Sequence, residues 1–291
     1  MKSAFIAVIG RPSSGKSTLI NRICRQKVSI VSTSPQTTRN KIRAIYNDSE
    51  GQLVFIDTPG YHVSDKKFNL YLKEQVKSAL EEVDLVLYVI DVTRKPGEEE
   101  GEICRITSAF ADKLVIALNK IDEKNNYVVE IRKFLEEEAR TAKIFEISGL
   151  TGAGVGELMD ELLDIAPEGV KFYPEEYYTD QEPEFRASEI IREKAITHVR
   201  QEIPHALYVE ISDMELQQEG QKLWIRAFLV VERESQKGIM IGRGGRMIRT
   251  IRLEAQEELN QIFPYVVHLD LRVKVNPRWR KNNSLLSKLF K

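Results

Sequence analysis

Cysteine and histidine are scarce in this chain. Only Cys24 and Cys104 occur among its 291 residues, and the four histidines are scattered, with no paired Cys or His at metal-ligand spacing. The pattern argues against a disulfide framework and against structural zinc. It fits reduced core thiols in a cytosolic protein.

Long apolar runs and excess charge are also missing. No apolar stretch approaches the ~18 residues that a membrane helix needs, and the opening MKSAF enters a strand-like run without a charged and apolar signal. The 43 Lys and Arg residues nearly balance the 44 Asp and Glu residues, for a net charge of -1. No global field therefore selects nucleic acid or an acidic partner, and any basic surface must be local. We expect a soluble, cytoplasmic monomer.

The chain does contain an alternation of apolar strands and helices up to about residue 165. Runs that are apolar on both faces are typical of a parallel sheet covered by helices on both sides. We therefore predict an α/β fold with a doubly wound, mostly parallel sheet, in which ligands bind beyond the carboxyl ends of the strands. The strand-like runs read AFIAVIG, QLVFIDT, DLVLYVIDV, KLVIALNKI and AKIFEIS.

The alternation of strands and helices ends at an acidic stretch that contains aromatic residues and proline, and a different order of elements follows it. We assign residues 1–170 to the α/β domain, residues 171–184 to a linker, and residues 185–291 to a smaller α+β domain. In the smaller domain a helix, EFRASEIIREKAITHVRQE, precedes the strands ALYVEISDMELQQ and KLWIRAFLVVER. A glycine loop, a helix from Met247 to about Gln261 and a last strand, VVHLDLRVKV, complete it.

A phosphate-loop pattern follows the first strand. The segment GRPSSGKS matches GxxxxGK[ST] between a strand and a helix. Its glycines let successive amides point inward, the helix N-terminus adds positive potential, and Lys16 can reach the outer phosphates, with Ser17 able to ligate Mg²⁺. The loop indicates a nucleoside triphosphate without choosing its base. Its candidate residues are Gly10, Arg11, Pro12, Ser13, Ser14, Gly15, Lys16, Ser17 and Thr18.

The motif DTPG ends the second predicted strand. Asp57 could hold the Mg²⁺ shell there, and the Gly60 amide could donate to a γ-phosphate. Thr58 and Pro59 lie between them and complete the candidate set.

The motif NKID ends a later strand and selects the base. Asp122 can accept hydrogen bonds from both the ring NH and the exocyclic amine of guanine, whereas adenine presents a lone pair at the first of these places. Lys120 can lay its stem along the base, and Asn119 can tie this loop to the phosphate loop. The three motifs together predict GTP rather than ATP.

With these motifs in order, the chain resembles the translation-factor-related GTPases, and more closely the Era family of ribosome-assembly GTPases, over essentially its whole length. In that family a switch segment reads QTTR, found here at residues 36–39, and a threonine in it contacts Mg²⁺ when GTP is bound. We favour Thr38 over Thr37. The resemblance implies Lys16, Thr38 and Gly60 as catalytic residues and Ser17, Thr38 and Asp57 as Mg²⁺ ligands.

A further family element abuts the base after the fifth predicted strand. It corresponds here to Ser148, Gly149 and Leu150, and Gly149 replaces the usual alanine. The resemblance implies that this contact runs through main-chain amides.

Two departures from the family bear on hydrolysis. Ras-like relatives position the attacking water with a glutamine after DxxG, but Tyr61 stands here, so intrinsic hydrolysis should be slow. Some relatives hold a K⁺ ion partly through a phosphate-loop asparagine, where this chain has Ser13. Potassium stimulation is therefore an open question, and a partner or a cation is expected to complete the site.

The second domain carries a GxxG loop within IMIGRGGRMIRTI. Such a loop lets an RNA backbone approach closely in a KH module, although glycines also simply end helices and strands. The element order resembles the type II KH domain of Era proteins, in which the glycine loop joins two helices. Arg252 departs from it, standing where many such loops carry glycine. The predicted RNA-binding residues are Ile241, Gly242, Arg243, Gly244, Gly245, Arg246 and Arg249.

Local charge agrees with RNA binding. From residue 237 to the end, twelve Lys and Arg residues face four acidic residues, a local net charge of +8 on a neutral protein. A solvated cationic surface would have the same composition.

The resemblance implies a GTP-hydrolysing switch that binds the 3′ end of 16S ribosomal RNA and acts in 30S subunit assembly. The alternative is an RNA-binding protein that senses GTP or GDP with negligible turnover. The tail SLLSKLFK is amphipathic and basic, so it could contact the inner face of the cell membrane peripherally, as relatives do. The alternative that we favour for it is a frayed terminus.

Overall fold

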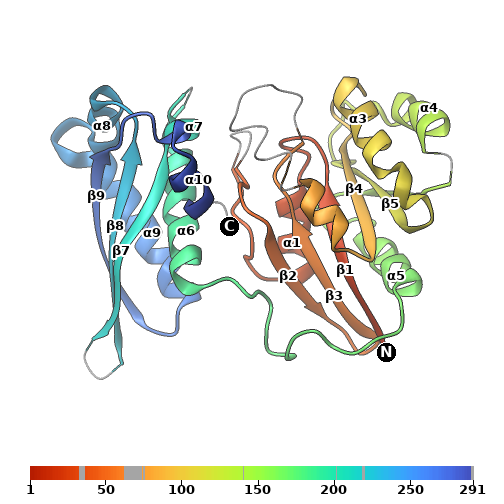
Figure 1. Cartoon of the computed structure of the whole chain (residues 1–291), viewed down its shortest axis with the longest axis horizontal. Coiled ribbons are helices and arrows are strands. Elements are labelled where there is room, and N and C mark those ends of the chain that lie inside the picture. Colours follow the sequence, from red (N-terminus) through yellow and green to blue (C-terminus); the bar gives the residue numbers. More distant parts are fainter. Residues whose placement is uncertain are drawn as a thin grey trace. The chain divides into compact units, whose positions relative to one another are not determined.

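The computed structural model describes residues 1–32, 37–61, 74, 76–139, 141–200, 202–217 and 220–289. The chain divides into two compact units, and the boundary lies between Asp180 and Gln181. Each unit has a sheet and a core of its own (Figure 1).

The first unit is built on a six-stranded sheet of order β2-β3-β1-β4-β5-β6. Neighbouring strands are parallel except for β2, which runs antiparallel to β3 at one edge. The register places Val8 beside Asp57 and Asp91 beside Asn119, so the carboxyl ends of these strands meet at one edge of the sheet. The strands are β1 (Lys2–Ile9), β2 (Ile42–Asn47), β3 (Gly51–Asp57), β4 (Leu85–Asp91), β5 (Leu114–Asn119) and β6 (Lys143–Ile147).

Helices cover both faces of this sheet, which explains why β3, β4 and β5 are buried along their whole length (Figure 1). On one face, Tyr88 and Ile116 pack against Ile103 and Ile131 of two helices. Two others contact β1, β3 and β6. The helices are α1 (Lys16–Cys24), α3 (Glu98–Thr107), α4 (Val128–Glu138) and α5 (Val155–Ile165), with a 3₁₀ segment η1 (Ser108–Lys113) after α3. The predicted doubly wound, mostly parallel α/β fold is confirmed.

Two elements differ from the sequence prediction. Strand β2 was not predicted; its buried residues, Ile42, Ala44 and Ile45, do not keep a strict alternation, which hid it. The segment FNLYLKEQVKSALEEV, residues 68–83, has Leu72, Val76, Leu80 and Val83 at helical spacing, which predicts a helix that the structure describes only in part. Residues 76–81 are helical, and most of the rest lies outside the described residues.

Much of the predicted linker belongs to the first unit. The buried Gln52 side chain accepts hydrogen bonds from the amides of Phe172 and Tyr173 and donates to the Tyr173 carbonyl at 2.8 Å. Phe172 also packs against Phe5, with ring centroids 4.4 Å apart and the ring planes tilted by 41°. The predicted linker, residues 171–184, is therefore divided, since residues up to 180 pack on the first unit and those from 181 join the second.

The second unit has a three-stranded sheet of order β7-β8-β9, in which β7 and β8 are antiparallel and β8 and β9 parallel. In β8, Leu223, Ile225, Ala227 and Leu229 are buried in strict alternation, because helices cover one face of the sheet. The elements are α6 (Pro183–Thr197), α7 (Ile203–Ala206), β7 (Tyr208–Gln217), β8 (Lys222–Val231), α8 (Glu234–Ile241), η2 (Arg243–Gly245), α9 (Arg246–Ile262), β9 (Val266–Val275), η3 (Trp279–Lys281) and α10 (Asn283–Leu289).

A helix stands on each side of the glycine loop, as the resemblance to KH modules predicted. The expectation of a frayed tail is wrong for residues 283–289, which form α10 with Leu286 buried. Nearby, the Trp279 indole donates to the Ala206 carbonyl at 2.9 Å and packs edge-on against Tyr208, so the tail closes this end of the domain. Among the described residues, no helix is long and apolar enough to span a membrane.

Candidate functional site

The phosphate loop connects β1 to α1 in the predicted place. Gly15 caps the helix with φ +93°, and a Cβ there would lie 2.3 Å from the Asn119 amide nitrogen, so only glycine fits. Arg11 lies within the turn, and Ser13 is exposed with φ +62°. The first amides of α1, at Lys16, Ser17 and Thr18, have no partner within the helix and can bind an anion.

Lys16 lies buried under this loop. Its ammonium donates to the carbonyls of Gly10 at 3.1 Å and Arg11 at 3.0 Å. Burial lowers the pKa of Lys16 to about 8, although the Asp57 carboxylate opposes that change. A buried cation beside free amides forms a strongly anion-attracting site.

Ser17, Thr38 and Asp57 converge although they come from three different segments. The Ser17 hydroxyl donates to Asp57 Oδ2 at 2.7 Å and lies 3.0 Å from the Thr38 hydroxyl. Thr38 Oγ1 lies 3.4 Å from the same carboxylate oxygen. Of the two alternatives, Thr38 has its hydroxyl beside Ser17 and Asp57, and its role as a Mg²⁺ ligand stays a prediction.

These three side chains fit Mg²⁺. All the donor atoms are hard oxygens, one carboxylate and two hydroxyls, which are the ligands that this ion prefers. Asp57 is fully buried, and its Oδ1 atom lacks a hydrogen-bond partner in the described part of the chain. Burial raises the pKa of the Asp57 carboxyl, against the opposing effect of Lys16. A bound divalent cation would satisfy the free oxygen and stabilise the ionised form.

The rest of DTPG forms a tight, buried turn against the phosphate loop. The Thr58 hydroxyl donates to the Val8 carbonyl at 2.7 Å, so its side chain fixes the turn and is turned away from the candidate site. A Cβ on Gly60 would lie 2.6 Å from Cα of Pro12, which excludes any larger residue. Pro59 is buried in the same turn.

Tyr61 is held away from the phosphate loop's open side. Its amide donates to the Gly10 carbonyl at 3.0 Å, and its hydroxyl donates to Glu102 in α3 at 2.7 Å. Burial, helped by Glu102, raises the pKa of Tyr61 to about 12. The phenol therefore stays neutral and bonded to Glu102, and the expectation that it does not replace a water-positioning glutamine stays a prediction.

Asn119 ties its own loop to the phosphate loop, as the sequence predicted, and it also bonds the loop at Gly149, which was not predicted. Its amide nitrogen donates to the Ser14 carbonyl at 2.8 Å, and its Oδ1 accepts from the Gly149 amide at 2.8 Å. The side chain is 2% exposed, so both bonds are shielded from water. The loop that would read the base is thereby locked to the loop that would hold the phosphates.

Lys120 and Asp122 follow, and they differ in their surroundings. Lys120 has φ +75°, and its ammonium pairs with Asp91 at 2.7 Å. Its stem approaches Gly15, and the expectation that it covers the base stays a prediction. The Asp122 carboxylate is exposed and makes no hydrogen bond or ion pair with any described residue, so it is available to a ligand.

Asp91 and Arg94 belong to the site but were missed from the sequence. Burial opposes ionisation of Asp91, but bonds from Lys120 and Thr93 keep its pKa below the usual value. Arg94 pairs with Asp91 at 3.2 Å and donates to the Pro12 carbonyl at 2.9 Å. No motif marked these residues. The only signal was the position of Asp91 at the end of a strand.

Ser148, Gly149 and Leu150 form the last loop of this edge. The Ser148 hydroxyl accepts from the Thr151 amide at 3.0 Å, and the exposed Leu150 accepts a hydrogen bond from Arg22 at its carbonyl. A Cβ on Gly149 would lie 3.2 Å from Cα of Leu19 in α1. The close approach gives a physical reason for glycine at a position where the family usually has alanine.

The glycine loop of the second unit is open. Gly244 has φ +59° and Gly245 φ +75°, and a Cβ on either would meet no atom within 4 Å. Gly244 is exposed and Gly245 half-buried, while Gly242 is packed, since its Cβ would lie 2.7 Å from Met247. Ile241 ends α8 beside the loop. The flanking Arg243, Arg246 and Arg249 are exposed.

Arg252, which departs from the usual loop pattern, takes part in a hydrogen-bond network. Its guanidinium donates to Gln256 at 3.3 Å, and the same Gln256 oxygen accepts from the Leu269 amide of β9 at 3.1 Å. The substitution joins α9 to the sheet and leaves the loop open.

Two protein-family models match the chain, one in each of its two units. A family model described as 50S ribosome-binding GTPase matches residues 5–120, and a KH domain model matches residues 202–280. GTPase Era of Treponema denticola is 50% identical over 292 residues, covering 99% of this chain and 99% of the relative. GTPase Era of Borreliella afzelii is 45% identical over 291 residues and the whole of both chains.

Two solved structures are similar over the full chain. One is Era in complex with MgGDPNP and nucleotides 1506–1542 of 16S ribosomal RNA, with 33% identity, a TM-score of 0.94, and coverage of 100% of this chain and 98% of that one. The other is an Aquifex aeolicus Era variant bound to GDP and AlF4⁻, with 34% identity, a TM-score of 0.93, and coverage of 100% and 99%. The chain belongs to the Era family of GTPases.

Proposed function

We propose that this GTPase binds the 3′ end of 16S ribosomal RNA through its KH domain and acts in assembly of the 30S subunit. The support is twofold. A similar Era protein binds MgGDPNP together with nucleotides 1506–1542 of 16S ribosomal RNA. This chain matches curated Era GTPases over its full length and theirs.

The observation that carries the nucleotide half of the proposal is the double hydrogen bond of Asn119. It makes one rigid site of the phosphate loop, the NKID loop and the loop at Gly149. In this site the loop amides and Lys16 bind the phosphates, Asp122 accepts from the guanine edge, and Lys120 covers the base. An exposed carboxylate beside a buried anion site suits guanine, which offers two donors to it.

Ser17, Thr38 and Asp57 would hold Mg²⁺. The ion supplies neutralising charge to the phosphate oxygens when it is bound. The chain's own contribution is preorganisation, because the hydroxyls of Ser17 and Thr38 already face Asp57 Oδ2. Thr38 would couple the switch segment to the nucleotide, since its hydroxyl reaches the site only when that segment lies close.

Hydrolysis needs a group that orients the attacking water. Lys16 and the Gly60 amide stabilise charge on the transferred phosphoryl group in our proposal, but Tyr61 is bonded to Glu102. We infer that a partner or a cation supplies the missing group. Single-turnover rates in Na⁺ and in K⁺, with and without RNA, test this inference: stimulation by either supports it, and a fast rate independent of both contradicts it.

The RNA half of the proposal rests on the open glycine loop. A phosphate backbone can approach Gly244 and Gly245 closely because a Cβ at either position would meet no atom within 4 Å. Arg243, Arg246 and Arg249 add cations around the loop, which would hold phosphates without selecting sequence. Specificity would come from bases lodged near Ile241 between the helices and the sheet.

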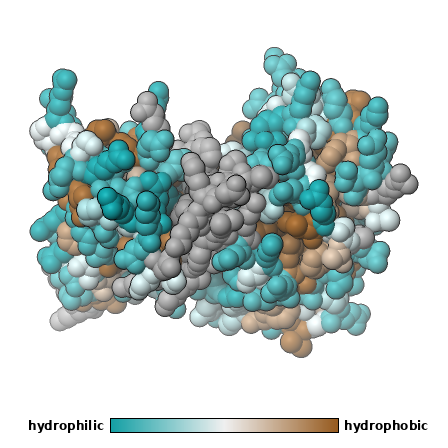
Figure 2. All heavy atoms as spheres, turned by 45° about the horizontal axis from the view of Figure 1, so that its top comes forward, coloured by the Kyte–Doolittle hydropathy of each residue, from teal (hydrophilic) through white to brown (hydrophobic). Residues whose placement is uncertain are grey.

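The proposed place of action is the cytoplasm, with peripheral contact of the tail at the inner face of the cell membrane as a second part. The face seen in Figure 2 is largely hydrophilic, with apolar residues in small patches. Leu286 of the tail is buried, which removes one apolar group from any membrane contact. Cosedimentation with anionic vesicles tests this part: binding lost on removal of residues 283–291 supports it, and no binding contradicts it.

A crossed experiment tests the proposal as a whole. Binding of a fragment with nucleotides 1506–1542 of 16S ribosomal RNA and release of phosphate from GTP are measured for two variants. Lys16→Ala should lose nucleotide binding and keep binding the fragment, while Arg243→Ala should weaken fragment binding and keep binding GDP. If the wild-type chain binds the fragment no better than an unrelated RNA, or releases no phosphate with RNA and K⁺ present, the proposal is wrong.

A further inference from the structure

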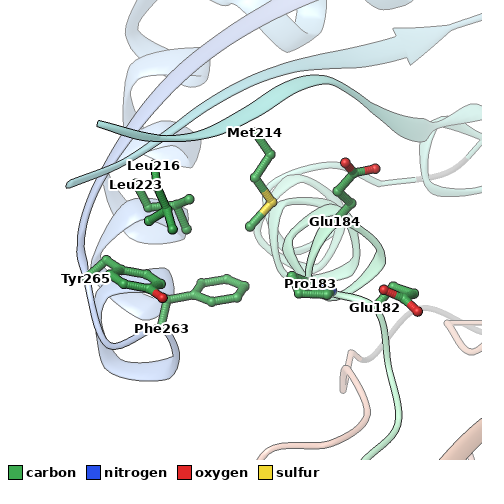
Figure 3. Close-up of a pocket in the computed structure, with 8 residues that line it drawn as sticks. All are labelled: Glu182, Pro183, Glu184, Met214, Leu216, Leu223, Phe263 and Tyr265. Carbon is green, nitrogen blue, oxygen red and sulfur yellow. The ribbon is translucent and has the colours of Figure 1, made fainter. Parts of the chain in front are cut away.

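The second unit contains a pocket that neither half of the proposed function uses. Its volume is about 580 Å³, within the range of ligand sites in proteins. It lies between the start of α6, the far end of the β7–β8 pair and the segment that joins α9 to β9 (Figure 3). The lining residues are Glu182, Pro183, Glu184, Met214, Leu216, Leu223, Phe263 and Tyr265.

The walls of this pocket are apolar and partly open to solvent. Leu223 forms a buried wall, Met214 and Phe263 are half-buried, and Leu216 is 53% exposed. Figure 3 shows the Met214 thioether pointing from β7 into the space between Pro183 and Phe263. Exposed apolar groups that gather around a hollow mark interaction sites, and methionine adapts its shape to different ligands.

The charged lining of the pocket is entirely acidic. Glu182 and Glu184 are exposed at the start of α6, and no Lys, Arg or His is among the lining residues. Such a rim repels phosphate and attracts cations. The apolar walls and the two glutamates therefore favour a ligand that combines an apolar group with positive charge, and they disfavour RNA.

The pocket is also separated from the glycine loop. The loop precedes the N-terminus of α9, whereas Phe263 and Tyr265 follow its C-terminus, 17 residues later. A helix of this length spans roughly 25 Å. A ligand in the pocket would thus leave the loop free.

We propose that this pocket binds a basic and apolar peptide segment of a partner protein. An aliphatic or aromatic side chain of the segment enters between Met214 and Phe263. Flanking Lys or Arg side chains pair with Glu182 and Glu184. The KH domain then carries two separate binding sites, an RNA site at the N-terminus of α9 and a protein site at its C-terminus.

Methionine methyl NMR on the full chain tests the proposal. The chain has five methionines, and of these only Met214 lines the pocket. The probe is acetyl-Lys-Lys-Leu-Phe-Lys-Lys-amide, and its matched control carries Glu in place of every Lys. The basic peptide should shift the Met214 methyl signal in a saturable way, and the acidic peptide should not.

Two variants sharpen the test. Leu216→Arg should weaken binding of the basic peptide by about tenfold or more, through lost apolar contact and added repulsion, and Leu216 is exposed enough to be changed without unfolding the domain. Leu253→Arg alters another exposed leucine of the unit, one outside the pocket lining, and should bind like the wild type. An unmoved Met214 signal at millimolar peptide, equal binding of both peptides, or an RNA fragment that shifts the signal would each overturn the proposal.

Discussion

The Asn119 side chain donates to the Ser14 carbonyl at 2.8 Å, deep in the first domain. The bond joins residues 105 positions apart in sequence and holds the base-reading loop against the phosphate loop. Replacement of Asn119 by Ala would leave the Ser14 carbonyl and the Gly149 amide buried without partners. We expect GDP affinity to fall by roughly 5- to 150-fold, the equivalent of about 1–3 kcal/mol.

Calorimetry with GDP measures that loss. The matched control is Asn126→Ala, because Asn126 is exposed and its amide bonds only the nearby Glu123 carbonyl at 3.3 Å. Equal GDP affinity in the two variants would contradict the role given to Asn119.

Nucleotide binding should be linked to the protonation of Lys16. Its pKa of about 8 in the free protein is low because the side chain is buried. Phosphate groups beside the ammonium would raise that pKa, so the complex is favoured most fully below pH 8 and weakens as the pH rises above it. Calorimetry of GDP binding at pH 8 in two buffers of different ionisation enthalpy should therefore detect proton uptake. Identical heats in both buffers would contradict the linkage.

Gly149 should not tolerate substitution by alanine. A Cβ would lie 3.2 Å from Cα of Leu19, so Gly149→Ala should lower the free energy of unfolding by about 1–3 kcal/mol and weaken GDP binding. Gly101→Ala is the matched control. Its Cβ would meet no atom within 4 Å in the middle of α3, and it should stabilise the protein by about 0.5–1 kcal/mol. Urea unfolding measures the free energy of unfolding of both variants. An unchanged value for Gly149→Ala would contradict the prediction, because it would mean that α1 shifts to make room for the methyl group.

Gln52 should control the segment that leads out of the first domain. Gln52→Ala removes the bonds to Phe172 and Tyr173 and leaves their amides unpaired, so we expect a loss of about 2–4 kcal/mol. Limited proteolysis should then cut residues 168–180 faster than in the wild type. Gln217→Ala changes an exposed glutamine and should leave the cleavage rate unchanged. Unaltered cleavage in Gln52→Ala would contradict the packing described for this segment.

The sequence predicted the elements whose pattern is local. Strands β3, β4 and β5 each contain a continuous apolar run, so their burial in a parallel sheet could be inferred from the sequence. Motifs at the ends of β1, β3 and β5 located the phosphate loop, DTPG and NKID, because parallel strands bring these ends to one edge.

Features that depend on tertiary contacts could not be predicted in this way. The edge strand β2 has no clean alternation, and the packing of residues 168–180 depends on Gln52, which lies more than 100 positions earlier. The role of Asp91 depends on its ion pairs with Lys120 and Arg94, which the sequence alone did not indicate. The tail was expected to be frayed because its apolar segment is short, whereas the structure shows it as α10 with Leu286 buried.

The central claim is that Asp122 selects guanine in a site built by the phosphate loop. Xanthine carries an oxygen where guanine carries its exocyclic amine, so the amide of Asp122→Asn can donate to xanthine but keeps only one of the two acceptor oxygens that guanine uses. Calorimetry should show that the wild type binds GDP and not ADP, that Asp122→Asn loses about a hundredfold or more in GDP affinity and gains affinity for XDP, and that Glu123→Gln behaves as the wild type. ADP binding as tightly as GDP, or unchanged GDP affinity in Asp122→Asn, would contradict the account.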